Sequence, residues 1–246
     1  MITLIRNIFR SRKSETDLLK GEIELIYNIV PQDFGGGCSL YKALVMGEII
    51  RQYKLRSSLD IGVYRGRSLF PMAIAHKFFT KGIVYGVDPY TKLDANQNDY
   101  PELKDELDKF VSVTDFQKIY KDVKDVIKNK ELDDNCILVR ETSSNAVLNF
   151  KKEGRKFGLI HIDGNHDTKF VIEDVLNYTP LLDHKGFVVL DDVSWNSVKP
   201  AYDILDKEMS LVIEFIDSLN DFALFAKGLT IDEVKELRAF LTKLVA

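Results

Sequence analysis

The sequence contains little cysteine and no long uninterrupted apolar run. Its two cysteines, Cys38 and Cys136, stand far apart and form no C-x-x-C pair. This spacing indicates neither a disulfide framework nor a zinc site, and it favours a reducing, cytoplasmic location. The apolar residues near the start are interrupted by charges every few positions. We therefore expect neither a signal peptide nor a membrane-spanning helix there.

An excess of positive charge is also missing. The chain has 34 Lys and Arg against 38 Asp and Glu, a net charge of −4, so we expect no nucleic-acid partner. Residues 1–13 alone are basic, with four Lys or Arg and no acid. We treat residues 1–20 as a basic N-terminal segment, which is either a frayed terminus or a short helix packed on the domain or on a partner. A weak amphipathic membrane anchor is the less favoured alternative.

Residues 21–246 fit one domain with a single core, of the α/β class. Short apolar strands alternate with helical patterns, which predicts βαβ crossovers and a mostly parallel, Rossmann-like sheet covered by helices on both faces. The predicted strands are 58–62, 82–88, 136–140, 157–163 and 186–193. The predicted helices are 38–54, 67–79, 143–152, 168–182 and 197–209.

Two segments depart from this alternation. Residues 211–216 and 222–226 are rich in strand formers and flank a turn, which predicts a C-terminal hairpin with one antiparallel strand, followed by a helix over 231–244. Residues 91–135 separate two strands by more than an ordinary connection and predict a helical insertion. Either a lid over the site or a helical crossover without a chemical role would explain the insertion.

The first strand ends in a glycine turn that lacks the full G-x-G-x-x-G pattern. Counting from Gly62, Tyr64 and Arg67 occupy the second and third glycine positions. This disfavours a pyrophosphate turn and hence a nicotinamide-dependent oxidoreductase, which we keep as an alternative. Asp60, two residues before the glycine, suggests a ligand with a cationic group. The amino and sulfonium groups of S-adenosylmethionine are of this kind.

The second strand ends in Asp88, followed by Pro89 and Tyr90. A carboxylate at this point can accept hydrogen bonds from two ribose hydroxyls. The same geometry serves nicotinamide cofactors, so Asp88 alone does not distinguish the two ligands. Tyr64 and Tyr90 flank these two turns and are included among the candidate cofactor contacts.

Three carboxylates follow two later strands. Asp163 ends one strand, and Asp191 and Asp192 end the next. Ligand sites of open α/β sheets lie beyond the carboxyl ends of their strands, so these acids should converge. Converging acids repel unless they are protonated or bridged by a cation. Oxygen ligands favour Mg²⁺, Ca²⁺ or Mn²⁺ over zinc, and Mg²⁺ is the ion we expect.

Two histidines lie close to these acids. His161 precedes Asp163 by two residues on the same strand face, which is typical of a satisfied core histidine. His166 follows on the loop and is better placed to move a proton. His166 and Asp163 are therefore the rival candidates for the general base.

The stretches LDIGVYRGRS, YGVDPY, IHIDGNHDTKFVIEDV and LLDHKGFVVLDDV resemble the class I S-adenosylmethionine-dependent methyltransferases. Within these, the chain is similar to the metal-dependent sugar O-methyltransferases of the macrocin type and to the cephalosporin-hydroxylase-like group, over about residues 35–230. The resemblance implies a seven-stranded sheet with one antiparallel strand. It places Gly62, Gly66 and Ser68 at the methionine end of the cofactor, Asp88 at the ribose, and Ser143 and Ser144 near the adenine. It also makes Asp163, Asp191 and Asp192 the metal ligands.

The expected reaction is an in-line attack of a substrate hydroxyl on the sulfonium methyl group, assisted by a divalent ion and a base. An ion held by three carboxylates has positions left for two substrate oxygens. The expected substrate is therefore a sugar, a glycoside or another small molecule with adjacent hydroxyls. A homo-oligomer is possible on this sequence, and a fold relative that binds the cofactor for other chemistry is the remaining alternative.

Overall fold

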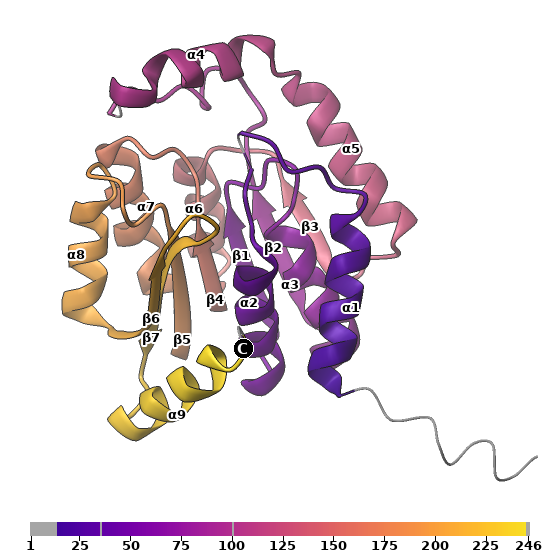
Figure 1. Ribbon diagram of the computed structural model, residues 1–246, viewed down its shortest axis with the longest axis vertical. Helices are drawn as coiled ribbons and strands as arrows, with labels where there is room; N and C mark the ends of the chain where they lie inside the picture. Colours follow the sequence, from indigo (N-terminus) through magenta and orange to yellow (C-terminus); the bar gives the residue numbers. More distant parts are fainter. Residues whose placement is uncertain (1–13, 35, 100, 245–246) are drawn as a thin grey trace, which may run out of the picture.

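The computed structural model describes residues 14–34, 36–99 and 101–244 (Figure 1). Within these residues, seven strands form one sheet in the order β3-β2-β1-β4-β5-β7-β6. The strands are β1 (Ser57–Ile61), β2 (Ile83–Val87), β3 (Cys136–Val139), β4 (Phe157–Ile162), β5 (Leu182–Asp191), β6 (Ser210–Ile216) and β7 (Asp221–Lys227). The pairs among β1 to β5 are parallel, and β7 runs antiparallel to both β5 and β6. The predicted Rossmann-like sheet with a C-terminal hairpin is thus confirmed.

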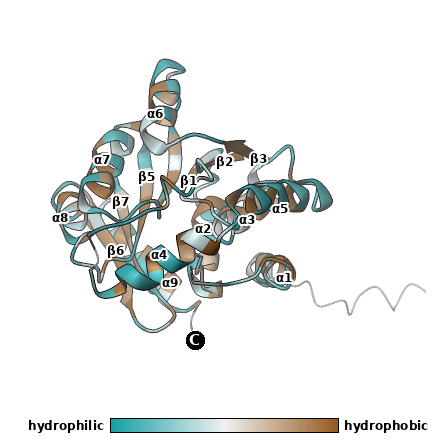
Figure 2. Ribbon diagram, turned by 90° about the horizontal axis from the view of Figure 1, so that it is seen from above, coloured by the Kyte–Doolittle hydropathy of each residue, from teal (hydrophilic) through white to brown (hydrophobic). Residues whose placement is uncertain are grey.

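Helices cover both faces of the sheet (Figure 2). One face carries α2 (Leu40–Gln52), α3 (Leu69–Ala75), α5 (Phe116–Asn129) and α9 (Ile231–Thr242). The other carries α6 (Ser143–Lys152), α7 (Thr168–Tyr178) and α8 (Lys199–Glu208). In β4, Leu159 packs into the first core and Ile160 into the second, because successive strand residues point to opposite faces. Two covered faces explain why the central strands are continuous apolar runs.

The chain enters the fold through a helix that the sequence pattern did not reveal. Helix α1 (Glu15–Tyr27) begins after a capping box at Ser14 and buries Leu19, Ile23 and Ile26. It packs on the outer side of α2 and α3. The boundary expected at residue 20 therefore falls inside a packed helix. The basic stretch 1–13, with its possible anchor role, lies outside the described residues.

The insertion between β2 and β3 divides into two parts with different positions. After the turn η2 (Pro101–Leu103), helix α4 (Lys104–Val113) crosses above the end of the sheet, and α5 then descends along its edge (Figure 1). Helix α5 buries Phe116, Ile119, Val123 and Ile127 in the core, as a crossover helix does. The insertion is thus helical, with α5 packed as a crossover helix and α4 above the end of the sheet, and a lid role for it stays a prediction.

Smaller differences from the expected elements have local causes. The helix expected over 67–79 divides into α3 and a π-helical turn, η1 (His76–Thr80), where the His76 ring bonds Ser58 and Thr80. The helix after β4 ends at Tyr178 and passes into a 3₁₀ turn, η3 (Thr179–Leu181), that contains Pro180. Of the helices in the described ranges, none is long and apolar enough to cross a membrane.

Candidate active site

A cavity of about 840 Å³ opens at the carboxyl ends of β1, β2, β4 and β5, beneath α4. This is the position that open α/β sheets use for ligands, and its volume suits a cofactor or substrate. Most of the residues predicted from the sequence line it: Gly62, Tyr64, Ser68, Asp88, Ser143, Ser144, Asp163, His166, Asp191 and Asp192. Three others, Asp60, Gly66 and Tyr90, do not line it.

The turn after β1 is built around Asp88. Both Tyr64 and Tyr90 have positive φ angles, 46° and 53°, which turn their backbone N–H groups inward. The Asp88 carboxylate accepts from the Tyr64 N–H at 2.8 Å and from the Tyr90 N–H at 2.7 Å. Burial raises the pKa of Asp88 to about 6, although these two bonds lower it. A partly buried carboxylate is thus fixed at the end of β2, facing the cavity.

Asp60 lies behind the turn instead of facing a ligand. Its carboxylate is fully buried, accepts a hydrogen bond from the Ser68 hydroxyl at 2.8 Å, and lies 2.7 Å from His161 Nδ1. The direct contact with the cationic end of a cofactor, expected from the sequence, is therefore not available to Asp60. Its effect on the site passes through Ser68, which does line the cavity.

Gly66 and Tyr90 also act indirectly. Gly66 has φ +84°, and a Cβ there would lie 2.6 Å from the Phe70 ring, so the glycine serves local packing. The Tyr90 ring is buried, with its centroid 5.1 Å from that of Tyr120. Its backbone N–H is the part that serves the site, because it orients Asp88.

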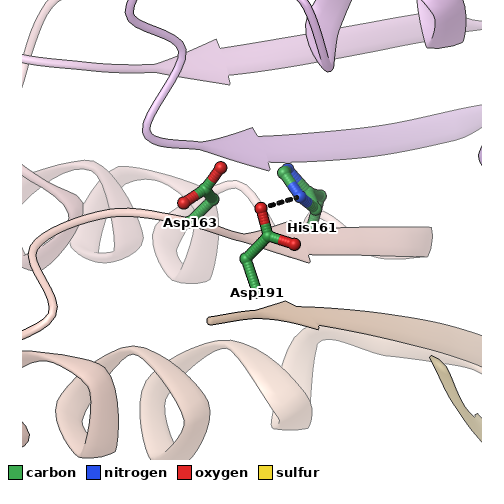
Figure 3. A group of neighbouring side chains, drawn as sticks. All are labelled: His161, Asp163 and Asp191. Carbon is green, nitrogen blue, oxygen red and sulfur yellow. Dashed lines mark ion pairs between the residues drawn. The ribbon is translucent and has the colours of Figure 1, made fainter. Parts of the chain in front are cut away.

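The strand-end carboxylates do not form one cluster of three. Two groups of donor atoms, each with its members within 4.8 Å of one another, share Asp163: one joins it to His161 and Asp191, the other to His166 and Asp192. Figure 3 shows the first group at the ends of β4 and β5. The donors of the second group suit a divalent ion, since they comprise two carboxylates and one imidazole.

Asp191 is already paired with a protein cation. The Lys42 ammonium, on α2, forms a buried ion pair with it and also donates to the Gly37 carbonyl at 3.2 Å. His161 Nε2 lies 3.7 Å from the same Asp191 oxygen. Burial raises the pKa of Asp191, but Lys42 and His161 outweigh it and hold that pKa well below the usual range. The sequence-based reason for an ion at Asp191, an uncompensated charge, therefore does not apply.

His166 stands between the other two carboxylates. Its Nε2 lies 2.9 Å from Asp192 Oδ2 and 3.3 Å from Asp163 Oδ1. On the other side of the ring, Nδ1 lies 3.2 Å from Gln97 Oε1. Burial lowers the pKa of His166, but Asp192 and Asp163 raise it well above its ordinary value. Burial and the charge of Asp191 raise the pKa of Asp163 to about 7.

The far end of the cavity is polar. Thr142 caps α6 by accepting from the Asn145 N–H, so the predicted residues Ser143 and Ser144 stand at the first turn of that helix. Asp174, on α7, faces the same end, and burial raises its pKa to about 7. Hydroxyl and carboxyl groups here offer donors and acceptors for a polar ring edge.

The cover over the cavity is aromatic on its inner side. The Phe110 ring of α4 lies 5.8 Å from Phe34 and 5.7 Å from Tyr64, between ring centroids. The loop before α4 is tied to the loop after β4, because Asp167 accepts from the N–H groups of Asn98 and Asp99 at 2.5 and 2.8 Å. The loop after β4 therefore carries His166 and anchors the cover.

Three site residues were not identified from the sequence: Lys42, Gln97 and Trp195. Lys42 is a charged residue near the start of a helical stretch that is mostly apolar, which is the signal that could have drawn attention to it. Gln97 lies in a polar loop without periodicity. The Trp195 ring lies 5.0 Å from that of His166, between centroids, and lines the cavity. Gln97 and Trp195 join the site only through tertiary packing.

A family model described as a methyltransferase domain matches residues 59–193. The O-methyltransferase from Bacillus cereus, in complex with SAH, shares 13% identity and a TM-score of 0.59, covering 91% of this chain and 94% of its own. TomG from Streptomyces achromogenes, an O-methyltransferase in complex with SAM, shares 11% identity and a TM-score of 0.58. The match covers 92% of this chain and 95% of TomG. The O-methyltransferase NovP shares 14% identity and a TM-score of 0.61, and the match covers 87% of this chain and 98% of NovP.

No curated protein matches the sequence. At these identities the solved structures establish a shared fold, and the macrocin-type subgroup stays a prediction. The family model, by contrast, matches more than half of the chain, including the glycine turn, Asp88 and the strand-end aspartates. The chain therefore belongs to the methyltransferase-domain family, as the class I resemblance of its motifs predicts.

Proposed function

We propose that this protein transfers the methyl group of S-adenosylmethionine to a hydroxyl oxygen of a small molecule with adjacent hydroxyls, such as a sugar or glycoside. One observation carries the proposal: a single cavity joins Asp88 to the cluster of Asp163, His166 and Asp192. A cofactor-holding carboxylate and groups able to handle a hydroxyl proton thus share one space. Family membership and the SAM and SAH complexes of the structural neighbours support the choice of cofactor.

The cofactor would extend across the strand ends. Asp88, held by two backbone N–H groups, would accept from the ribose hydroxyls. Gly62 and Ser68 would border the methionine end, and Ser143 and Ser144 the adenine. The nicotinamide alternative is disfavoured by the family match and by Tyr64 and Arg67, which occupy two glycine positions of the pyrophosphate-binding pattern.

A divalent ion, Mg²⁺ in the sequence-based prediction, fits the carboxylates of Asp163 and Asp192, whose donor atoms already converge with His166. When bound there, the ion would supply a Lewis acid that makes the acceptor hydroxyl more acidic. The residues around it would fix the position of the acceptor and exclude water, and α4 would cover them from above. Asp163 and His166 stay the candidate proton acceptors.

In the proposed step, the acceptor oxygen forms a bond to the methyl carbon while the sulfur–carbon bond breaks. The hydroxyl proton passes to the base, and S-adenosylhomocysteine leaves with the former bonding pair on sulfur. The chain contributes alignment of oxygen, carbon and sulfur, which lowers the barrier because the reacting atoms are already held in line. The Trp195 ring beside His166 offers a face on which a sugar ring could stack.

The test is direct methyl transfer. The full chain is incubated with S-adenosylmethionine, Mg²⁺ or Mn²⁺, and a panel of glycosides, free sugars and catechols. A gain of one methylene, about 14 Da, in an acceptor supports the proposal. Lack of calorimetric binding of S-adenosylhomocysteine to the folded protein would contradict it. The cytoplasmic location expected from the sequence stays a prediction, and the sequence leaves the oligomeric state open.

A further inference from the structure

We propose that His166, and not Asp191, completes the metal site together with Asp163 and Asp192, and that Lys42 keeps Asp191 out of it. This inference rests on the proposed function, and it names the residues of this chain that hold the ion. The resulting set of one nitrogen and two carboxylate ligands favours Mn²⁺ over Mg²⁺, compared with a site of three carboxylates.

The orientation of His166 is that of a metal ligand. Its Nε2 lies 2.9 Å from Asp192 Oδ2 and 3.3 Å from Asp163 Oδ1, so a small shift of these three atoms encloses an ion. Its Nδ1 lies 3.2 Å from Gln97 Oε1, an oxygen that can only accept. Metal-binding histidines usually donate their other ring N–H in this way, which fixes the ring and leaves the ligating nitrogen free.

Asp191 is committed elsewhere. Lys42 and Asp191 are 4% and 5% exposed, and the ammonium faces that carboxylate. If Asp191 turned to an ion, the ammonium would stay buried without its counter-charge, which strongly disfavours the movement. The other oxygen, Oδ1, points away from Asp163 in Figure 3 and accepts no hydrogen bond from the described residues. The predicted trio of carboxylates therefore loses one member to a protein cation.

The donor set sets the metal preference. Carboxylate and water oxygens suit Mg²⁺, whereas imidazole suits the transition ions, and Mn²⁺ accepts both kinds of ligand. Replacing one carboxylate by the His166 nitrogen therefore weakens Mg²⁺ more than Mn²⁺. The converse substitution, His166→Asp, restores an all-oxygen set and should shift the preference back toward Mg²⁺.

The experiment measures metal binding alone, by calorimetry and by Mn²⁺ paramagnetic resonance, on the full chain without cofactor. We expect His166→Ala to weaken Mn²⁺ binding by at least about tenfold, since even the outer partners of a ligand have effects of that size. His166→Asp should lower the ratio of Mn²⁺ to Mg²⁺ affinity. The paired variant Lys42→Met with Asp191→Asn removes both charges together, so the buried pair stays balanced, and it should bind Mn²⁺ like the unchanged protein.

Lys42→Met alone should have a different effect from the paired variant. It frees the Asp191 carboxylate and should therefore tighten Mn²⁺ binding. The inference is overturned if the paired variant loses as much affinity as Asp163→Asn, or if His166→Ala binds Mn²⁺ normally. Failure of the unchanged protein to bind Mn²⁺ also overturns it. That last result would leave methyl transfer itself to be judged separately, by binding of S-adenosylhomocysteine and by the mass shift of an acceptor.

Discussion

In the proposed cofactor complex, Asp88 would need the opposite protonation state from the one that stabilises the free protein. Without a ligand, burial raises its pKa from 3.8 to about 6, so the folded chain holds this proton more tightly than the unfolded chain does. Its contribution to stability is thus fully present below about pH 4 and is lost as the pH rises through about 6. A ribose, in contrast, donates to the ionised carboxylate and should bind better once the proton has left.

We therefore expect the affinity for S-adenosylhomocysteine to rise between pH 5 and pH 7, centred near the Asp88 pKa of about 6. Asp88→Asn should flatten this rise, and Asp88→Ala should cost about 1.5–3 kcal/mol of binding free energy per lost bond. Calorimetry across this pH range is the measurement. A profile that is unchanged in folded Asp88→Asn would show that another group titrates.

Gly62 illustrates how the structure changes the reason for a sequence feature. The sequence suggests that this glycine lets the backbone approach a ligand, so that Gly62→Val would fold and fail only in binding. In the fold, a Cβ at Gly62 would lie 1.8 Å from the backbone oxygen of Asp163, at φ +87°. The glycine is thus required by the contact between β1 and the loop after β4, and a side chain there disturbs the fold itself.

The expected cost of Gly62→Ala is about 2–6 kcal/mol of unfolding free energy, the sum of overpacking and an unfavourable φ. Gly154→Ala is the matched control, because Gly154 has φ +64° with nothing within 4 Å of its Cβ position. That control should lose only the backbone part, about 1–2 kcal/mol. Urea unfolding of both variants measures the difference. Equal losses would mean that the close approach to Asp163 relaxes without cost.

At the scale of elements, the loop before α4 depends on one side chain of another loop. Asp167 accepts from the N–H groups of Asn98 and Asp99, and its second oxygen accepts from the Asn98 side chain at 3.3 Å. Nothing in the sequence links residues so far apart. Gln97, which holds His166, lies directly beside this attachment. The attachment therefore couples the cover to the loop that carries His166.

Asp167→Ala should release this loop, since each charge-assisted bond contributes about 1.5–3 kcal/mol to local order. We expect hydrogen exchange at the amides of Asn98 and Asp99 to accelerate by about tenfold or more, with the sheet amides unchanged. Asp167→Asn keeps one acceptor oxygen and should show an intermediate effect. Exchange that stays slow in Asp167→Ala would show that α4 is held by its own packing.

The elements themselves were largely predictable, because strands buried on both faces and helices with apolar stripes leave periodic patterns. Helix α1 was not predicted, because the segment 1–20 was assigned by its basic residues. The helical spacing of the apolar residues Leu19, Ile23 and Ile26 crosses the end of that segment. The cavity-lining residues that the sequence indicated lie at strand ends or soon after them along the chain, as for Asp88, Asp163 and His166. Gln97 lines the cavity and Lys42 pairs with Asp191, both from distant elements, and spacing along the chain carries no record of these contacts.

At the scale of the whole molecule, the residues proposed to contact the cofactor and those proposed to hold the ion come from different halves of the sheet. Asp88 and the glycine turn follow β2 and β1, whereas Asp163 and Asp192 follow β4 and β5. The two proposed sites share one cavity, yet Asp88, the residue proposed to hold the ribose, is not part of the proposed ion site. Binding of the cofactor and binding of the ion should therefore be separable, although the proposed reaction uses both.

This separation gives an expected result for metal removal. S-adenosylhomocysteine at one hundred times its Kd should stabilise the chain by about 2.7 kcal/mol, and raise its Tm by roughly 5–11 °C for a domain of this size. EDTA should leave that shift intact, because the ribose and methionine contacts come from β1 and β2, while it abolishes methyl transfer. Mn²⁺ added in excess over the chelator should restore turnover. If EDTA removed the Tm shift as well, the ion would contact the cofactor directly. Full turnover in metal-free protein would instead leave the protein's own cations, Lys42 and His166, as the groups that balance the strand-end carboxylates during the reaction.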